Sequence, residues 1–205
     1  KEAVESNEQA LDTLRQGMFA PKNRGKQIEK TDEGFPVSQH LLVTGFLGDD
    51  EVEVYPGVTH LDFTGPHQVL SRLPNARLIV ASLGGEDVEA EGLTFGRLTD
   101  LRDIERCDVL CVPGGLGTPD AMLNRDYMAE VTRLAKGAKY LTSVCTGSLI
   151  LAATGLIRGR RAACHWAWRD LLTPFGVVID EGRVARDGNL ITVIPDDSDR
   201  RRRRR

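Results

Sequence analysis

Short apolar runs alternate with helical patterns along most of this 205-residue chain, beginning near residue 40. The predicted strands cover residues 41–47, 77–83, 108–112, 139–144 and 161–164. The predicted helices cover residues 66–73, 121–136, 148–153 and 166–172. A hairpin is predicted at Asp187-Gly188, between strand-like runs at 183–186 and 190–194, because this dipeptide favours a tight turn. Such alternation is typical of an α/β domain with a mostly parallel sheet, whose sites form beyond the carboxyl ends of the strands.

The composition fits one soluble globular domain and argues against several function classes. Hydrophobic residues make up 40% and charged residues 28% of the chain, and the net charge of −3 indicates no general affinity for nucleic acid. No apolar stretch is long enough to span a bilayer and no signal peptide is visible, so we expect a cytoplasmic protein without membrane contact. Cys107, Cys111 and Cys164 lie in apolar runs without metal-site spacing, and we expect them to be small buried residues in a reducing compartment.

The two ends of the chain are expected to lie outside this domain. Residues 1–38 are polar and predict a flexible extension, and residues 39–194 are expected to form the domain itself. Residues 195–205 begin with acidic side chains and end in six arginines. A charge run of this kind predicts a solvated, disordered tail, although a nucleic-acid or membrane patch is the alternative interpretation.

Cys145 stands at the junction of a predicted strand and a predicted helix. The apolar run 139–144 ends at this cysteine, and a turn of small residues leads into the helix 148–153. A sharp turn of this kind exposes a side chain and directs the first free N–H groups of the helix at it. Because the positive end of the helix dipole stabilises an anion, we expect the Cys145 thiol to have a pKa below its ordinary value of about 8.5.

A second turn of small residues follows the buried strand 108–112, at Pro113-Gly114-Gly115. Glycine permits close approach and lets backbone N–H groups face a ligand. The N–H groups of Gly115 and Thr146 are therefore candidates for a pocket that holds developing negative charge. Taken alone, a Pro-Gly-Gly sequence indicates no more than a turn.

Two further side chains are candidates for proton transfer beside the thiol. Asp62 lies between apolar residues just before Gly65-Pro66, where it could cap a helix or exchange a proton with the cysteine. His165 closes the strand 161–164 and could serve as a base, although an isolated histidine is more often structural.

Four segments together carry a resemblance to the ThiJ/PfpI superfamily, which has the class I glutamine amidotransferase-like fold. They are VPGG at 112–115, SVCTGSLILA at 143–152, RAACHW at 161–166 and RVARDGNLIT at 183–192. The segment LDFTGPH at 61–67, and threonine rather than histidine after Cys145, most resemble the isocyanide hydratase branch. The resemblance covers about residues 41–192. It implies a flavodoxin-like three-layer sandwich with a nucleophile elbow, and a homodimer with the active site near the interface.

The resemblance also implies a reaction on a small-molecule substrate, in which water adds to an isocyanide and gives an N-formamide. Cys145 would attack the terminal carbon and form a thioimidate, while Asp62 would handle protons and activate water. Thr146 would contribute its N–H and hydroxyl near the substrate. Gly115, with Gly114 beside it, would orient the bound group. The reaction needs no cofactor and no metal.

The chain departs from the family pattern in two places. Residues 48–54 read as an insertion, with a turn at Gly48-Asp49-Asp50 and an alternating run at 51–54 that is typical of an exposed strand or hairpin arm. This insertion could reshape the surroundings of Asp62. The family continues beyond Thr192 with a glycine-rich turn and a long helix, whereas this chain continues with the acidic and arginine-rich segment. We therefore expect the C-terminal helix to be missing and apolar surface to be exposed.

Two other functions remain open at the level of sequence. Similar domains sense ligands in transcription regulators, but no helix-turn-helix segment follows Thr192. Other members of the superfamily are glyoxalases, deglycases or peptidases. Threonine at 146 argues against peptidase chemistry, and Asp62 stands where a glyoxalase usually has glutamate.

Overall fold

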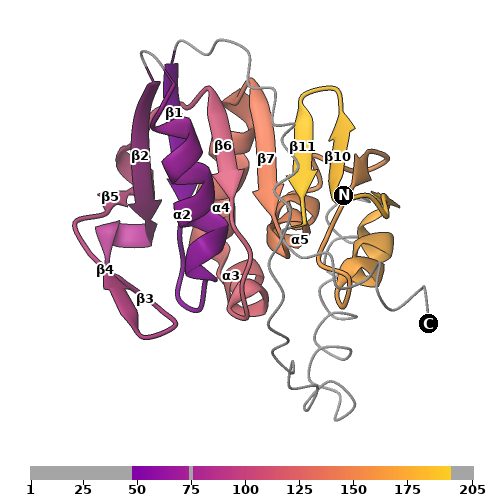
Figure 1. Cartoon of the computed structure of the whole chain (residues 1–205), viewed down its shortest axis with the longest axis horizontal. Coiled ribbons are helices and arrows are strands. Elements are labelled where there is room, and N and C mark those ends of the chain that lie inside the picture. The colour runs from indigo at the N-terminus through magenta and orange to yellow at the C-terminus, as the bar shows by residue number, and fades with distance from the viewer. Residues whose placement is uncertain (1–47, 74–75, 195–205) are drawn as a thin grey trace.

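The computed structural model describes residues 48–73 and 76–194, and its main sheet has seven strands in the order β10-β11-β7-β6-β1-β2-β5 (Figure 1). These strands are β1 (Gly48–Glu53), β2 (Ala76–Ser82), β5 (Thr99–Asp100), β6 (Val109–Val112), β7 (Tyr140–Val144), β10 (Val184–Asp187) and β11 (Leu190–Val193). Neighbouring strands run parallel, except that β10 is antiparallel to β11. The prediction of an α/β fold with a mostly parallel sheet is confirmed.

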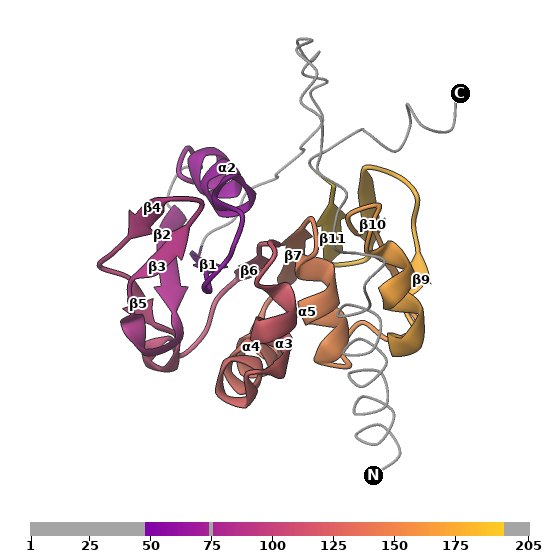
Figure 2. The ribbon, with the colours of Figure 1, turned by 90° about the horizontal axis from the view of Figure 1, so that it is seen from below.

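Helices cover both faces of the sheet. Helix α2 (His60–Leu70) lies on one face, and α3 (Thr118–Leu123), α4 (Arg125–Gly137) and α5 (Gly147–Ala153) lie on the other (Figure 2). All residues of β6 are buried, as expected for a central parallel strand covered by helices on both faces. This arrangement forms the three layers of a flavodoxin-like sandwich.

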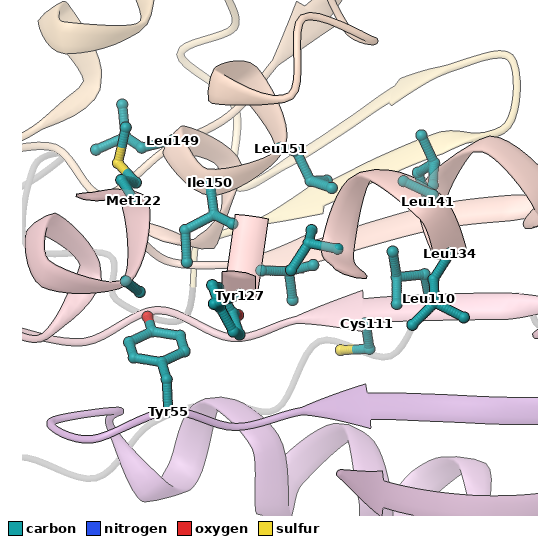
Figure 3. Close-up of a cluster of buried hydrophobic side chains, with 14 of the residues drawn as sticks. Tyr55, Leu110, Cys111, Met122, Tyr127, Leu134, Leu141, Leu149, Ile150 and Leu151 are labelled. Atoms are coloured by element: carbon teal, nitrogen blue, oxygen red, sulfur yellow. The ribbon is translucent and has the colours of Figure 1, made fainter. Parts of the chain in front are cut away.

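The core fills the space between the sheet and α3, α4 and α5 (Figure 3). Leu110 and Leu141 from the sheet are buried in the same cluster as Leu134, Leu149 and Ile150 from the helices. On α4 the buried positions recur at helical spacing, which gives the helix one apolar face. The core thereby fixes the positions of β6, β7 and α5, whose ends carry the candidate site.

Smaller elements complete the fold at its edges. They are the hairpin of β3 (Val88–Ala90) and β4 (Leu93–Phe95), the pair β8 (Arg161–Ala162) and β9 (Val178–Ile179), and three 3-10 helices at Leu83–Gly85, Leu101–Asp103 and Arg169–Phe175. Neither the β3–β4 hairpin nor β5 is predicted from the sequence. The hairpin predicted at Asp187-Gly188 is confirmed, with Gly188 at a positive φ of 59°.

The turn predicted at Gly48-Asp49-Asp50 is wrong, and the strand predicted at 51–54 lies in the middle of the sheet instead of at an exposed position. Gly48–Glu53 form β1, which pairs with β2 on one side and β6 on the other. The alternating valines explain this outcome, because Val52 and Val54 are both fully buried. The predicted strand 41–47 lies outside the described residues, as do the predicted N-terminal extension and the residues 195–205.

Three helices differ from their predicted limits. Helix α2 begins at His60 and contains Pro66, so Asp62 lies in its first turn instead of before the helix. The predicted helix 121–136 is two helices, because the Asn124 side chain accepts hydrogen bonds from the N–H groups of Asp126 and Tyr127 and caps α4. The predicted helix 166–172 is instead the 3-10 helix Arg169–Phe175.

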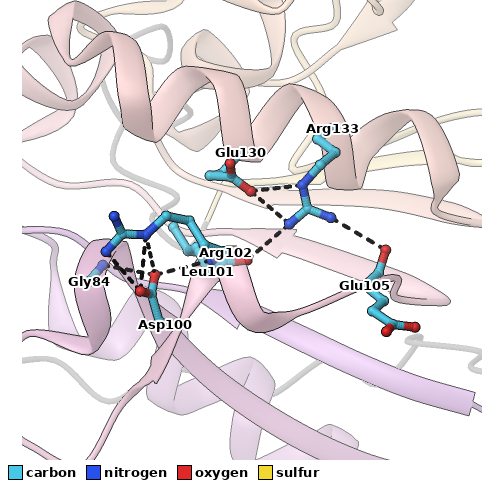
Figure 4. A network of polar contacts seen from close by, with 7 residues as sticks. All are labelled: Gly84, Asp100, Leu101, Arg102, Glu105, Glu130 and Arg133. Atoms are coloured by element: carbon cyan, nitrogen blue, oxygen red, sulfur yellow. Dashed lines mark hydrogen bonds and ion pairs between the residues drawn. The ribbon is translucent and has the colours of Figure 1, made fainter.

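A polar network fastens α4 to the chain that leads into β6 (Figure 4). The Arg133 guanidinium donates to the carbonyls of Leu101, at 3.0 Å, and Glu105, at 3.3 Å, and pairs with Glu130 on its own helix. Nearby, Asp100 accepts from Arg102 and from the N–H of Gly84. These contacts fasten α4 and the segment after β5 to each other at one edge of the sheet.

Among the described helices, none combines the length and apolar character needed to cross a membrane.

Candidate active site

The predicted site residues meet beyond the carboxyl ends of β6 and β7, where a parallel sheet places its sites. Cys145 directly follows β7, and the Pro113-Gly114-Gly115 turn directly follows β6. Asp62 comes from the first turn of α2. The start of this helix is joined to the β6 turn, because the Thr59 N–H donates to the Gly114 carbonyl at 2.9 Å.

Cys145 has a positive φ of 59°, which residues with a side chain adopt rarely. We call this sharp turn between β7 and α5 the elbow; that its cysteine is a nucleophile stays a prediction. The Cys145 N–H donates to the Val193 carbonyl at 2.8 Å, and its carbonyl accepts from the His165 N–H at 3.2 Å. Such a strained conformation persists only where neighbours hold it. Here β11 and the segment after β8 hold it on both sides.

Gly114 allows the β6 turn to touch the elbow. A Cβ atom at this position would lie 2.5 Å from the Thr146 nitrogen and 2.8 Å from the Cys145 Cβ, both closer than real atoms approach. Glycine is therefore required at 114 by lack of space. This close approach brings the Gly114 N–H to the Asp62 carboxylate, with which it forms a hydrogen bond.

Asp62 is a buried carboxyl group in direct contact with the thiol. Its side chain is 2% exposed and forms hydrogen bonds with the Cys145 thiol and the Gly114 N–H. Burial raises the pKa of Asp62 to about 6, and the Glu91 charge acts in the same direction. Its Oδ2 has no hydrogen-bond partner within the described part of the chain. Asp62 can therefore gain and lose a proton near neutral pH, and one oxygen remains available for a substrate or water.

The expectation of a lowered thiol pKa is wrong in this structure. Burial, followed by the charge of Asp62, raises the pKa of Cys145 above its ordinary value, and the hydrogen bond from the Thr146 N–H offsets only part of this. Helix α5 is short, and its dipole does not overcome these effects. At neutral pH the pair is consequently a thiol that donates to a carboxylate, and the thiol proton has an acceptor beside it.

The N–H of Gly115 donates to the Thr146 Oγ1 at 2.9 Å and is thus engaged within the protein. Its expected role toward a bound group stays a prediction. Thr146 itself is 4% exposed, and its hydroxyl also contacts the Thr118 hydroxyl at 2.7 Å. The Thr146 backbone N–H forms a hydrogen bond with the Cys145 sulfur. Its expected role beside a substrate stays a prediction.

His165 reaches the site through its backbone. Its N–H holds the Cys145 carbonyl, while its side-chain Nδ1 accepts from the Ala167 N–H at 3.3 Å. The adjoining Cys164 is fully buried, and burial raises the pKa of its thiol to about 12. Cys107 and Cys111 are buried as well, which confirms the prediction for these three cysteines.

Two residues that the sequence analysis did not single out also lie at the site. They are Tyr55, after β1, and Thr118, at the start of α3, and both are buried. No sequence pattern marks them, because each depends on contacts across the fold. Within residues 48–73 and 76–194, no group of three or more His, Cys, Asp or Glu side chains is arranged to hold a metal ion.

Comparisons with known proteins identify relatives of this chain. A model of the DJ-1/PfpI family matches residues 52–198. The chain is 41% identical over 152 residues to the isonitrile hydratase of Pseudomonas putida, and the aligned region covers 74% of this chain and 64% of the hydratase. It is 28% identical over 100 residues to a deglycase of Pyrococcus horikoshii, and the aligned region covers 49% of this chain and 58% of the deglycase.

The fold is also that of a solved relative. The crystal structure of a ThiJ/PfpI family protein from Pseudomonas syringae matches with a TM-score of 0.70 and 33% identity, covering 78% of this chain and 70% of that one. The chain spans just under two thirds of the length of the hydratase that it matches. The family model, however, covers well over half of this chain, including every residue of the site. The chain therefore belongs to the DJ-1/PfpI family.

Proposed function

We propose that this protein adds water to an isocyanide and releases an N-formamide. The observation that carries the proposal is the hydrogen bond between the Cys145 thiol and the buried Asp62 carboxylate. The isocyanide carbon accepts a soft sulfur nucleophile and must also gain protons, so it needs a thiol and a proton carrier in contact. The similarity to an isonitrile hydratase supports the same chemistry.

In the first half of the reaction, the Cys145 sulfur bonds to the terminal carbon of the isocyanide. The thiol proton passes to Asp62 as the S–C bond forms, so no free thiolate has to exist beforehand. Asp62 then delivers this proton to the same carbon, which gives a thioimidate, Cys145–S–CH=N–R. The Thr146 N–H stabilises negative charge on the sulfur during the attack.

In the second half, the Asp62 carboxylate takes a proton from water while the water oxygen bonds to the thioimidate carbon. Asp62 passes that proton to the nitrogen, which gives a tetrahedral adduct, Cys145–S–CH(OH)–NH–R. The C–S bond then breaks as the carbon–oxygen double bond forms, and the hydroxyl proton returns to the sulfur. The net change is one isocyanide and one water converted into one formamide.

A direct product assay tests this proposal. The full chain is incubated with an alkyl isocyanide, and the N-alkylformamide is measured by liquid chromatography and mass spectrometry. We expect steady formation by the wild type, none above background by Cys145→Ala, and retained formation by Cys164→Ala, which removes a neighbouring buried thiol. Equal rates for the wild type and Cys145→Ala would contradict the proposal.

A deglycase or glyoxalase activity is the second candidate, favoured by the similarity to a deglycase. The same three proteins are therefore assayed with methylglyoxal. Consumption of methylglyoxal that depends on Cys145, without formamide formation from the isocyanide, would favour this second function.

A further inference from the structure

A chain of buried polar groups runs behind the site and connects Tyr55 to the elbow. The Tyr55 hydroxyl lies 3.0 Å from the Pro113 carbonyl and 3.0 Å from the Thr118 Oγ1. The Thr118 Oγ1 lies 2.7 Å from the Thr146 Oγ1, which accepts from the Gly115 N–H at 2.9 Å. Figure 3 shows the Tyr55 hydroxyl directed at the chain that follows β6.

The direction of this chain follows from counting protons. Each hydroxyl has one proton to donate, and the Tyr55 proton is used on the Pro113 carbonyl. Thr118 therefore donates to Tyr55. The Thr146 hydroxyl has two acceptors within reach, the Thr118 Oγ1 at 2.7 Å and the Gly115 carbonyl at 3.3 Å, and its one proton goes to the shorter contact. With this assignment the chain runs from the Gly115 N–H to the Pro113 carbonyl.

The chain begins and ends on the two peptide groups that flank Gly114. The Pro113–Gly114 peptide accepts from Tyr55 through its carbonyl and donates to Asp62 through its N–H. The Gly114–Gly115 peptide accepts from the Thr59 N–H and donates to Thr146. Each peptide group is thereby held at both ends.

We propose that Tyr55 and Thr118 are positioning residues, which orient and polarise the Pro113–Gly114 peptide so that its N–H stabilises the Asp62 carboxylate. A hydrogen bond accepted by a carbonyl strengthens the N–H of the same peptide as a donor, because successive bonds polarise one another. Burial raises the pKa of Tyr55, so its hydroxyl remains a donor at neutral pH. The catalytic consequence rests on the proposed hydratase function, whereas the effect on Asp62 does not.

The test follows the ionisation of Asp62 through the reactivity of Cys145. Below the pKa of Asp62, the Asp62 carboxyl and the Cys145 thiol each hold a proton. Above this pKa the two groups share one proton, and for part of the time the proton is on Asp62 and Cys145 is a reactive thiolate. The rate of Cys145 alkylation by iodoacetamide should therefore rise with pH and level off near pH 6 in the wild type. Mass spectrometry of the Cys145 peptide measures this rate without any assumption about the substrate.

Tyr55→Phe and Thr118→Val each break the chain while keeping the shape of the side chain. We expect both variants to move this inflection upward by about 0.5 pH unit, because the carboxylate loses part of its stabilisation. Thr118→Ser keeps the hydroxyl and should titrate as the wild type. Asp62→Asn should lose the inflection altogether, which verifies the readout.

Tyr127→Phe is the matched control, because it removes a hydroxyl from a buried tyrosine outside the hydrogen-bonded chain whose ring packs against Tyr55, with centroids 5.7 Å apart. This variant should alter thermal stability without changing the pH of the inflection. The proposal would be overturned if Tyr55→Phe and Thr118→Val, both shown to be folded by circular dichroism, have the inflection in alkylation rate at the same pH as the wild type. If Tyr55→Phe does not fold, the pair Thr118→Val and Thr118→Ser decides alone. A shifted inflection with no formamide formed would retain the positioning role and reject the hydratase.

Discussion

An Asp62→Asn variant is expected to lose about 10³-fold in formamide formation, the middle of the range for a general acid–base group. Asparagine keeps the size of the side chain but cannot take the proton of the Cys145 thiol or that of water. The proposed reaction would then lack its proton carrier in both halves. Turnover of an alkyl isocyanide at pH 7.5 measures the loss, and turnover within threefold of the wild type would contradict the assigned role.

The same variant is expected to gain stability relative to the wild type as the pH rises. The pKa of Asp62 is raised from 3.8 to about 6 by burial, so the folded state holds this proton more tightly than the unfolded state. The contribution of Asp62 to the free energy of unfolding is fully present below pH 4. It is lost as the pH rises from 4 to 6, by about 3 kcal/mol in all. Asp62→Asn has no such loss.

Urea unfolding of the wild type and Asp62→Asn at pH 4 and pH 8 measures the difference. Asp100→Asn serves as a control without such a pH difference, because Arg102 lowers the pKa of Asp100 to about 2. The stability that the wild-type Asp100 contributes is nearly complete at both pH 4 and pH 8 and is lost only as the pH falls from about 4 to about 2, so its removal should cost about the same at both test values. Parallel pH profiles for the wild type and Asp62→Asn would contradict the buried carboxylate.

Gly114→Ala is the second change with a large expected effect. The added methyl group would overlap the Thr146 nitrogen, the Thr146 Oγ1 at 2.7 Å and the Cys145 Cβ. We expect a loss of about 1–3 kcal/mol in stability from overpacking, and about 10²-fold in activity from displacement of the elbow. Urea unfolding and the formamide assay measure both quantities.

Gly65→Ala is the matched control for this substitution. Gly65 lies in the same helix as Asp62, and a Cβ there meets no atom within 4 Å outside its chain neighbours and the helix's own backbone. The helix propensity of alanine is offset here by Pro66, which disfavours helical backbone in the residue before it, so we expect a stability change within about 1 kcal/mol and unchanged activity. Equal effects of Gly114→Ala and Gly65→Ala would show that the close approach at Gly114 has no importance for the site.

The parts of the fold that the sequence predicted well are those with strong apolar patterns. The runs that became β2, β6 and β7 are apolar enough to be recognised without their neighbours. The first half of β1 is wrongly predicted as a turn because Gly48-Asp49-Asp50 locally favours one, and its strand conformation depends on pairing with β2 and β6. Local pattern contains no information on such pairing.

The site shows the same division between local and tertiary information. Cys145, Asp62 and Gly114 were predicted because their segments carry recognisable motifs. The pKa of the thiol was predicted in the wrong direction, because the helix after Cys145 is visible in sequence but burial and the Asp62 charge are not. Tyr55 was missed for the same reason. The homodimer and the cytoplasmic location stay predictions.

The most direct test of the central claim is the detection of the covalent intermediate on Cys145. The wild-type chain is mixed with an alkyl isocyanide, quenched in acid within its first turnovers, digested and examined by mass spectrometry. We predict a mass increase of one isocyanide molecule on the Cys145 peptide and none on the peptides that carry the other three of the four cysteines. Formamide production with no adduct on Cys145, or an adduct shared equally among the cysteines, would contradict the account.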